Sequence, residues 1–460
     1  MKLNKKLTMK KIIFLVIASG LIFTSCEDFL EETSTIGLSA EKLTDISSMN
    51  SLNAGAFNDL RSFYAYQPMI TTSLVRDIKI RRSANWIPFY KWTSSGIPPM
   101  FSGNSWNAAF RALNKVNTVL NSDIDNMYGT AGERASVKGD AFFIRAAVYF
   151  QLNNYFTNPN TGISVPLVTT VLGTNARVPL ETSEKIRTQI ESDIEAARTS
   201  LLVKGGVNSY AAATAMAARI YFYHGKYNLA YERANEVITD GGYSLETNLA
   251  DIYTKGNASS EVIYSIITNL SENDFGAGSQ GFEQFQANEA NGTASVNING
   301  LIGKLRAADP VDKRFTDLMK EGDGLIYANG KYPNNAVDYI GIRLAEMYLT
   351  RAESNIMVNN SVSADDVSDV NMIKNRAGAS DVVSGLPNQV AMLEIIFNER
   401  SKELCFEWGD RFLNTRRLKK DIINESGDGY VSHSQYNNLL YYLPPLITDN
   451  AEVRKTSLFL

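Results

Sequence analysis

Apolar residues recur at intervals of three and four positions along most of the chain, the spacing that lines one face of an α-helix. The segments with this spacing are 106–120, 138–155, 211–223, 344–351, 365–376 and 391–406. A further helix is expected from Ser183, whose hydroxyl can cap it, to about residue 202. Two short runs, 164–168 and 262–268, have the composition of strands. Because strands and helices do not alternate regularly, the pattern predicts a mainly α fold without a doubly wound sheet.

One helix pair has the spacing of a tetratricopeptide repeat. Small residues in 217–221 stand where paired helices cross, Gly225 ends the first helix, and Ala234 belongs to the second. The helices around Arg145 and Arg351 resemble weaker copies of this unit. We therefore expect a few repeat units embedded in a larger helical domain, with ordinary helical hairpins as the alternative.

Two long stretches lack a clear period and are predicted to be irregular loops. Residues 61–103 are rich in aromatic residues, Arg, Ser and Pro, and residues 271–335 are rich in Gly, Asn and Ser. The end of the chain, from Gly427, also lacks a period. Because loops carry binding residues more often than packed helices do, we expect the ligand regions in the two long loops.

The first 25 residues have the pattern of a secretory signal peptide. Five lysines precede an apolar run from 12 to 23, shorter than the roughly 20 residues needed to cross a bilayer. Thr24 and Ser25 then lead into Cys26, which resembles a lipobox, where a lipoprotein signal peptidase cuts before an acylated cysteine. We therefore expect residues 1–25 to be removed and Cys26 to carry a lipid anchor. An ordinary signal peptide followed by a chance cysteine is the alternative.

Removing the signal peptide makes the chain more acidic. Five lysines and no acids leave with it, so the formal net charge changes from −4 to −9. Nucleic-acid binding needs clustered basic residues, and this charge gives no electrostatic basis for it. Cys405 is then the one thiol left beside the acylated Cys26, so no disulfide framework is possible and stability must come from core burial.

The sequence contains few candidates for catalytic or cofactor chemistry. Residues 276–281 fit G-x-G-x-x-G, but no helical pattern follows to hold a pyrophosphate, so a flexible loop is the better interpretation. His224 is expected at a helix C-terminus, where a partly charged imidazole suits the helix dipole, and His433 lies in a polar stretch. Cys405 is expected mid-helix, as a buried and inert thiol. We expect no catalytic residue, no metal site and no cofactor.

Three acids recur every fourth residue near the end of segment 391–406: Glu399, Glu403 and Glu407. A glycosidase needs two carboxylates that face each other across a cleft, whereas these would stack along one stripe of a helix. The arginines that lie near them in the sequence are Arg400, Arg411, Arg416 and Arg417. Acids and arginines together favour a structural ion-pair network, with a catalytic pair as the less favoured alternative.

The order of these segments resembles the SusD/RagB family of nutrient-binding outer-membrane lipoproteins, over essentially the whole mature chain from 26 to 460. The most specific match is Ala-Phe-Phe-Ile-Arg-Ala-Ala-Val-Tyr-Phe at 141–150, which fits the family's A-x-F-x-R-A-x-x-Y-F block. Further blocks match at 342–353, 371–378 and 399–412. Cys26 and the acids after it resemble the family's mature start, whereas 442–446 reads Tyr-Leu-Pro-Pro-Leu where the family often has Pro-Ile-Pro.

The resemblance implies one SusD-like helical domain with tetratricopeptide-type helix pairs, long irregular loops and a few short strands. It also implies a binding protein without enzymatic activity, anchored in the outer membrane and facing the exterior. Such a protein would bind a glycan or peptide and deliver it to a TonB-dependent transporter of the SusC type. Two other classes remain open: a repeat scaffold lipoprotein with protein partners only, and a surface glycan-degrading enzyme.

The ligand site is expected in the loop that runs from residue 76 to residue 92. The candidate residues there are Arg76, Asp77, Arg81, Trp86, Tyr90 and Trp92. Aromatic rings stack on the C–H faces of sugars, while Arg and Asp bind hydroxyl groups, and the family often places ligand-stacking aromatics in this stretch. Phe282, with Phe275 and Phe285, is a weaker candidate for a facing wall. Alternatively, Trp86 and Trp92 pack a loop core or contact the transporter.

Overall fold

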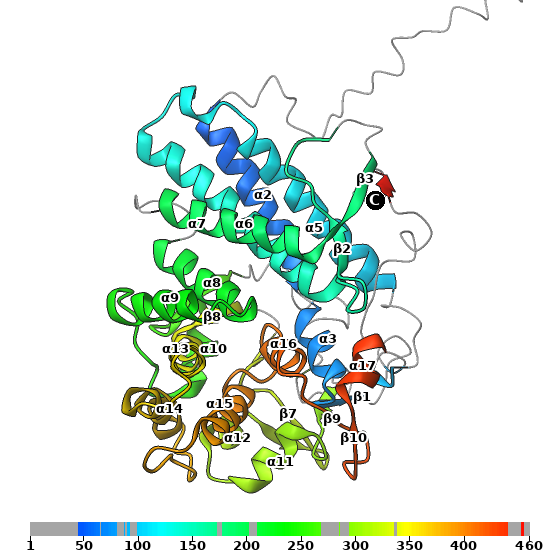
Figure 1. Cartoon of the computed structure of the whole chain (residues 1–460), viewed down its shortest axis with the longest axis vertical. Helices are drawn as coiled ribbons and strands as arrows, with labels where there is room; N and C mark the ends of the chain where they lie inside the picture. The colour runs from blue at the N-terminus through cyan, green and yellow to red at the C-terminus, as the bar shows by residue number, and fades with distance from the viewer. Residues whose placement is uncertain are drawn as a thin grey trace, which may run out of the picture. The chain divides into compact units, whose positions relative to one another are not determined.

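Helices make up most of the chain that the computed structural model describes (Figure 1). The described residues are 45–64, 66–80, 87, 90–92, 99–172, 177–201, 209–267, 285, 294–334, 338–439 and 452–454. The expected signal peptide, Cys26 and the glycine-rich loop at 276–281 lie outside these residues. The mainly α fold class predicted from the sequence is confirmed.

The first group of long helices comprises α2 (Ile46–Tyr64), α5 (Pro99–Leu120), α6 (Ala131–Phe156) and α7 (Ser183–Ser200). Helix α2 packs on α5 and α6, and α6 packs on α7 (Figure 1). Arg145 of α6 joins three of these helices, because its buried guanidinium lies 2.7 Å from Asp193 of α7 and 3.0 Å from the Asn117 amide oxygen of α5. The helix expected from Ser183 is confirmed, but its cap is Thr182, whose hydroxyl accepts from the Lys185 N–H.

The second group continues this packing as a stack of helix pairs. Its helices are α8 (Tyr210–Tyr223), α9 (Tyr227–Asp240), α13 (Leu344–Asn359), α14 (Ala364–Arg376) and α15 (Gln389–Glu403). Helix α7 packs on α8, α8 on α9, α9 on α13, and α13 on both α14 and α15. Gly225, with φ +75°, reverses the chain between α8 and α9, and the fully buried Ala217 and Ala218 belong to α8. The predicted repeat-type helix pairs are therefore present.

Strands are short, and they form both local hairpins and pairs between segments that are distant in sequence. The antiparallel pairs are β1 (Ile78–Ile80) with β5 (Ala294–Val296), β4 (Val262–Ile266) with β8 (Tyr339–Arg343), β6 (Lys320–Gly322) with β7 (Leu325–Tyr327), and β9 (Ile422–Ile423) with β10 (Tyr430–Val431). Strand β3 (Arg177–Thr182) lies between β2 (Ile163–Pro166) and β11 (Glu452–Arg454). In the β1–β5 pair, Ile78 stands opposite Val296, which brings the end of α3 beside the segment that follows residue 294.

The two stretches predicted to be irregular loops contain regular elements, so that part of the prediction was wrong. The first contains the end of α2, all of α3 (Gln67–Leu74), β1 and the start of α5. The second contains β5, α11 (Leu301–Ala308), α12 (Lys313–Thr316), β6 and β7. The chain after Gly427 also forms β10 and α17 (His433–Leu439). The remaining short helices are η3 (Ile124–Asn126), α10 (Leu249–Lys255), η4 (Gly256–Ala258) and α16 (Asp410–Arg417).

A network of charged side chains lies in the interior around the end of α15. We call it the buried ion network; its members are Glu261, Asp312, Arg314, Lys331, Arg343, Lys374, Arg376, Glu399, Lys402, Glu403 and Glu407, and each side chain is at most 6% exposed. Arg343 is central, since its guanidinium lies 2.8 Å from Glu261, 2.5 Å from Glu403 and 3.0 Å from Glu407. Burial alone would raise the pKa of Glu403, but Arg376, Arg343 and Arg314 outweigh that effect and hold the pKa well below its usual range.

The interpretation of the three glutamates as members of a structural ion-pair network is therefore supported. The arginines that were expected to pair with them, however, were the wrong ones. None of the four arginines near them in sequence pairs with Glu399, Glu403 or Glu407 within the described part of the chain. Those arginines have other partners: Arg400 pairs with Asp410, Arg411 with Asp77 and Arg417 with Glu353, and Arg416 donates to the Asn154 carbonyl. Glu407 also lies beyond the end of α15, so the three acids do not form a single helical stripe.

Replacing Arg343 with Met is expected to lower the free energy of unfolding by about 3–5 kcal/mol, because three buried carboxylates lose a common partner. The matched control is Arg306→Met, which removes an exposed pair with Glu321 and should change stability by less than about 1 kcal/mol. Urea unfolding followed by circular dichroism measures both. Equal losses in the two variants would contradict a stabilising role for the network.

Candidate functional site

The expected ligand segment contains an unusual stack of two side chains. The Arg76 guanidinium lies over the Trp92 ring, 4.1 Å from its centroid, and both residues are partly exposed. Their backbones have φ values of +58° and +56°, whereas only six non-glycine residues in the described chain have a positive φ. Such conformations cost of order 1 kcal/mol or more and occur preferentially at functional sites. We call this pair the Arg76–Trp92 platform.

Buried contacts of Asp77, the residue after Arg76, hold the platform in place. The Asp77 side chain is fully buried and its carboxylate lies 3.5 Å from Nε of Arg411 in α16. The Asp77 N–H donates to the Thr72 carbonyl of α3, so the chain leaves α3 in a fixed direction. Burial raises the pKa of Asp77 to about 6, although the charge of Arg411 acts in the opposite direction.

The segment after β5 supports the platform from the other side. The Asn297 side chain donates to the Arg76 carbonyl at 2.8 Å, and the Asn297 N–H donates to the Asp77 carbonyl at 2.8 Å. Gly300, at the start of α11, comes so close that a Cβ atom there would lie 2.6 Å from the Arg76 carbonyl oxygen. Only glycine therefore fits against this strained turn without a shift of the backbone.

Helix α17 provides the aromatic neighbour of the platform. The Tyr436 ring lies 6.4 Å from the Trp92 ring and 5.2 Å from the ring of His433. Tyr436 is fully buried, and its hydroxyl donates to the Lys420 carbonyl at 2.8 Å. Sequence reasoning missed Tyr436 because it treated the chain after Gly427 as irregular.

Three polar atoms around the platform have no hydrogen-bond partner in the described part of the chain: Nε of Arg76, Nε1 of Trp92 and the hydroxyl of Tyr90. Burial lowers the pKa of Arg76, against the effects of Tyr90 and Glu425. Burial also raises the pKa of Tyr90 to about 12, and the charge of Glu425 adds to that increase. The platform thus combines a flat cation and an indole with three buried polar atoms that have no partner within the described chain.

The predicted ligand residues lie in different environments. Arg76 and Trp92 are together and partly exposed, whereas Asp77 and Tyr90 are buried beside them. Arg81, Trp86 and Phe282 lie outside the described residues, as does Phe275. Phe285 is 1% exposed and stacks on Tyr332 at 4.8 Å, so it is a core residue and not part of a facing wall.

The other candidate residues have structural surroundings. His224 is the C-cap of α8 as predicted, but burial lowers its pKa despite the neighbouring Glu191, so the expected partial charge was wrong. Cys405 is buried as predicted, with its pKa raised to about 11 by burial, but it lies in the turn after α15 and not mid-helix. Within the described residues no group of three or more His, Cys, Asp or Glu side chains could hold a metal ion. No helix among them is both long and apolar enough to cross a membrane.

Known structures show the same fold. A SusD superfamily protein from Bacteroides thetaiotaomicron VPI-5482 is 21% identical and has a TM-score of 0.72, with 90% of this chain and 95% of that chain covered. A SusD superfamily protein from Bacteroides fragilis is 22% identical, with a TM-score of 0.71 and coverage of 87% and 97%. A SusD-like carbohydrate binding protein from Bacteroides vulgatus ATCC 8482 is 19% identical, with a TM-score of 0.70 and coverage of 82% and 84%.

Two family models match the sequence. Residues 316–442 match the model described as the SusD family. Residues 28–222 match the SusD-like model described as "Starch-binding associating with outer membrane". A comparison with curated proteins found no match. With the helix-pair fold described above, these two matches show that the chain belongs to the SusD/RagB family, whose proteins bind carbohydrate and are associated with the outer membrane.

Proposed function

We propose that this protein is a lipid-anchored outer-membrane lipoprotein that binds a nutrient, a glycan or a peptide, outside the cell. It passes this nutrient to a TonB-dependent transporter of the SusC type. Family membership supports the general role, and the Arg76–Trp92 platform is the observation that carries the binding role. A strained, partly exposed cation–indole stack is costly to maintain, and ligand binding explains why it is kept.

The platform has the chemistry that a sugar requires. An indole ring binds the C–H faces of a pyranose, and the partly exposed Arg76 guanidinium can donate to its hydroxyl groups. Asp77 and Tyr90 are buried beneath, so in this proposal they position the platform and do not touch the ligand. Arg81, Trp86 and Phe282 remain proposed ligand residues from neighbouring segments. Binding without chemical conversion is part of the same proposal.

The anchor is proposed at Cys26, after removal of residues 1–25. One acyl chain gives only marginal membrane binding, whereas several chains on one cysteine give a stable anchor. An acylated Cys26 would attach the chain to the membrane through its N-terminus. Such an attachment suits a protein that must approach a transporter in the same membrane.

A ligand is first identified by screening glycan and peptide pools. Replacing Trp92 with Ala is expected to weaken its binding by about ten-fold or more, because ring stacking on the ligand and the stack with Arg76 are both lost. Isothermal titration calorimetry measures the affinity. Intrinsic fluorescence gives a second readout, since Trp106 and Trp408 are 2% and 1% exposed and should not respond to ligand. The control is Tyr128→Ala, which removes an aromatic ring that is 94% exposed in a different segment. Unchanged affinity in Trp92→Ala would place the site elsewhere.

Replacing Cys26 with Ala is expected to leave the precursor uncleaved or to release the protein from the membrane. Cell fractionation and metabolic labelling with a fatty acid measure the two outcomes. Cys405→Ala is the matched control, because that buried thiol should accept no lipid. A Cys26→Ala protein that is processed normally and still fractionates with the outer membrane would contradict the anchor.

The raised pKa of Asp77 predicts a pH effect on stability. Its pKa is about 6 in the folded chain and near the ordinary 3.8 in the unfolded chain, so folding takes up a proton between these values. This group's contribution to stability therefore increases as the pH falls from 7 towards 4. Asp77→Asn removes the titration with little change in shape. Urea unfolding across this range should show wild type gaining stability relative to Asp77→Asn as the pH falls, whereas parallel curves would contradict the shift.

A further inference from the structure

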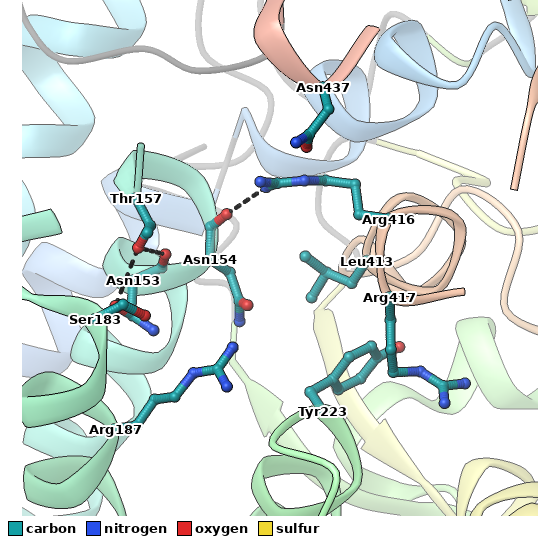
Figure 2. A pocket seen from close by; sticks show the side chains of 10 residues that line it. All are labelled: Asn153, Asn154, Thr157, Ser183, Arg187, Tyr223, Leu413, Arg416, Arg417 and Asn437. Atoms are coloured by element: carbon teal, nitrogen blue, oxygen red, sulfur yellow. Dashed lines mark hydrogen bonds between the residues drawn. The ribbon is translucent and has the colours of Figure 1, made fainter. Parts of the chain in front are cut away.

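A cavity separate from the Arg76–Trp92 platform lies beside α17. It is a cavity of about 320 Å³ between the end of α6, the start of α7, the end of α8, α16 and α17 (Figure 2). Three arginines line it: Arg187 of α7 and Arg416 and Arg417 of α16. Among the described residues that line it there is no acidic side chain, and the rest of this lining consists of amides, hydroxyls and Leu413.

Two of these arginines have no carboxylate partner in the described chain. Arg187 makes no ion pair or hydrogen bond there, and it is exposed. Arg416 donates to the Asn154 carbonyl at 2.7 Å and to no acid. Figure 2 shows their guanidinium groups reaching towards Asn154 from opposite walls of the cavity. Partial burial lowers the pKa of both arginines, although the charge of Glu191 acts in the opposite direction on Arg187.

Three acids near the cavity have other partners, whereas Glu184, in the first turn of α7, is exposed and has no ion pair in the described chain. Arg417 is held by Glu353 at 2.5 Å, and its guanidinium points away from the centre of the cavity in Figure 2. Asp410 accepts from Arg400 and from the Tyr223 hydroxyl. Glu191 accepts from Lys226 and lies 2.8 Å from His224. The described lining of the cavity therefore contains three arginines and no acid, and the N-terminal end of α7 adds positive potential there.

We propose that this cavity binds the carboxylate of an acidic sugar unit, a uronic acid, between Arg187 and Arg416. A planar guanidinium matches a carboxylate in a two-pronged hydrogen bond, and opposed guanidiniums can share its two oxygens. The cavity volume lies in the range of small-ligand sites and exceeds what a lone ion needs. The side chains of Asn154, Ser183 and Asn437 supply donors and acceptors for ring hydroxyls. This proposal rests on the proposed glycan-binding function.

The test is calorimetric titration of the purified mature chain with glucuronate and galacturonate, and with glucose and galactose as neutral counterparts. The uronates are expected to bind, and the neutral sugars to bind at least about ten-fold more weakly. Arg187→Gln should weaken uronate binding by about ten-fold or more, because a charge-assisted contact is lost. Arg416→Gln should have the same effect, with circular dichroism as a check on folding, since that arginine also holds Asn154.

Two control variants separate this proposal from a general charge effect and from binding at the Arg76–Trp92 platform. Lys185→Gln removes a positive charge two residues away on the same helix, on a side chain that is 67% exposed and paired with Glu181, and should leave uronate affinity unchanged. Trp92→Ala should also leave the affinity for monosaccharide uronates unchanged. Failure of the proposed platform and failure of the proposed cavity site therefore give different results. Absent uronate binding, or unchanged binding in Arg187→Gln, would overturn the proposal. Inorganic sulfate binding as tightly as uronate would overturn the assignment to a sugar.

Discussion

The burial of charge around the end of α15 is the constraint on which the rest of the structure depends. Arg343 of β8, Arg314 of α12, Arg376 of α14 and Glu261 before β4 all meet Glu403 or its neighbours in the interior. A buried ion is tolerated only while its partners are in place, and removing one leaves the others unpaired in a poorly solvating environment. The network therefore joins four segments between 261 and 376 to one helix end, and none can move independently.

The candidate ligand site depends on the same helix end. The chain passes from Glu407, in the network, through Gly409 directly into α16, where Arg411 meets the buried Asp77. Asp77 in turn fixes the residue before it, Arg76, in its strained conformation over Trp92. A chain of short contacts thus connects the interior charges to the partly exposed platform. Binding loops need a rigid base, and here ion pairs contribute to it beside the buried apolar residues of α3 and β1.

The sequence predicted long helices from the repeated spacing of their apolar residues and missed the eight-residue helix α3. In 138–155 and 344–351 apolar residues recur at helical spacing, although nearly all residues of both segments are buried. All eight residues of α3 are buried, including Gln67, Thr71 and Ser73, so no polar face marks its period. Gln67 is instead satisfied by the hydroxyls of Tyr155 and Tyr339, which lie 88 and 272 residues away in sequence. Partners at that separation leave no local pattern in the sequence.

Partners that are remote in sequence also limit how much of the site the sequence could predict. The composition of 76–92 located the segment, because Trp and Arg concentrate there, but it could not tell Arg76 and Trp92, which are partly exposed, from Asp77 and Tyr90, which are buried. That distinction depends on α16 and on the segment after β5, both remote in sequence. The arginine cavity was missed for a similar reason, since Arg187 and Arg416 are 229 positions apart and neither forms a motif by itself.

Helix α17 connects the two candidate binding features. Tyr436 packs on Trp92, and the next residue, Asn437, lines the cavity. Successive residues of a helix point about 100° apart, so one short helix can present different side chains to two neighbouring sites. The platform has one indole and one cation and suits a neutral ring, whereas the described lining of the cavity has three arginines and no acid and suits a charged one. A glycan with alternating neutral and acidic units would satisfy both, and a neutral glycan would leave Arg187 and Arg416 without a counter-ion. The unpaired arginines therefore favour an acidic polysaccharide over starch as the nutrient in the proposed function.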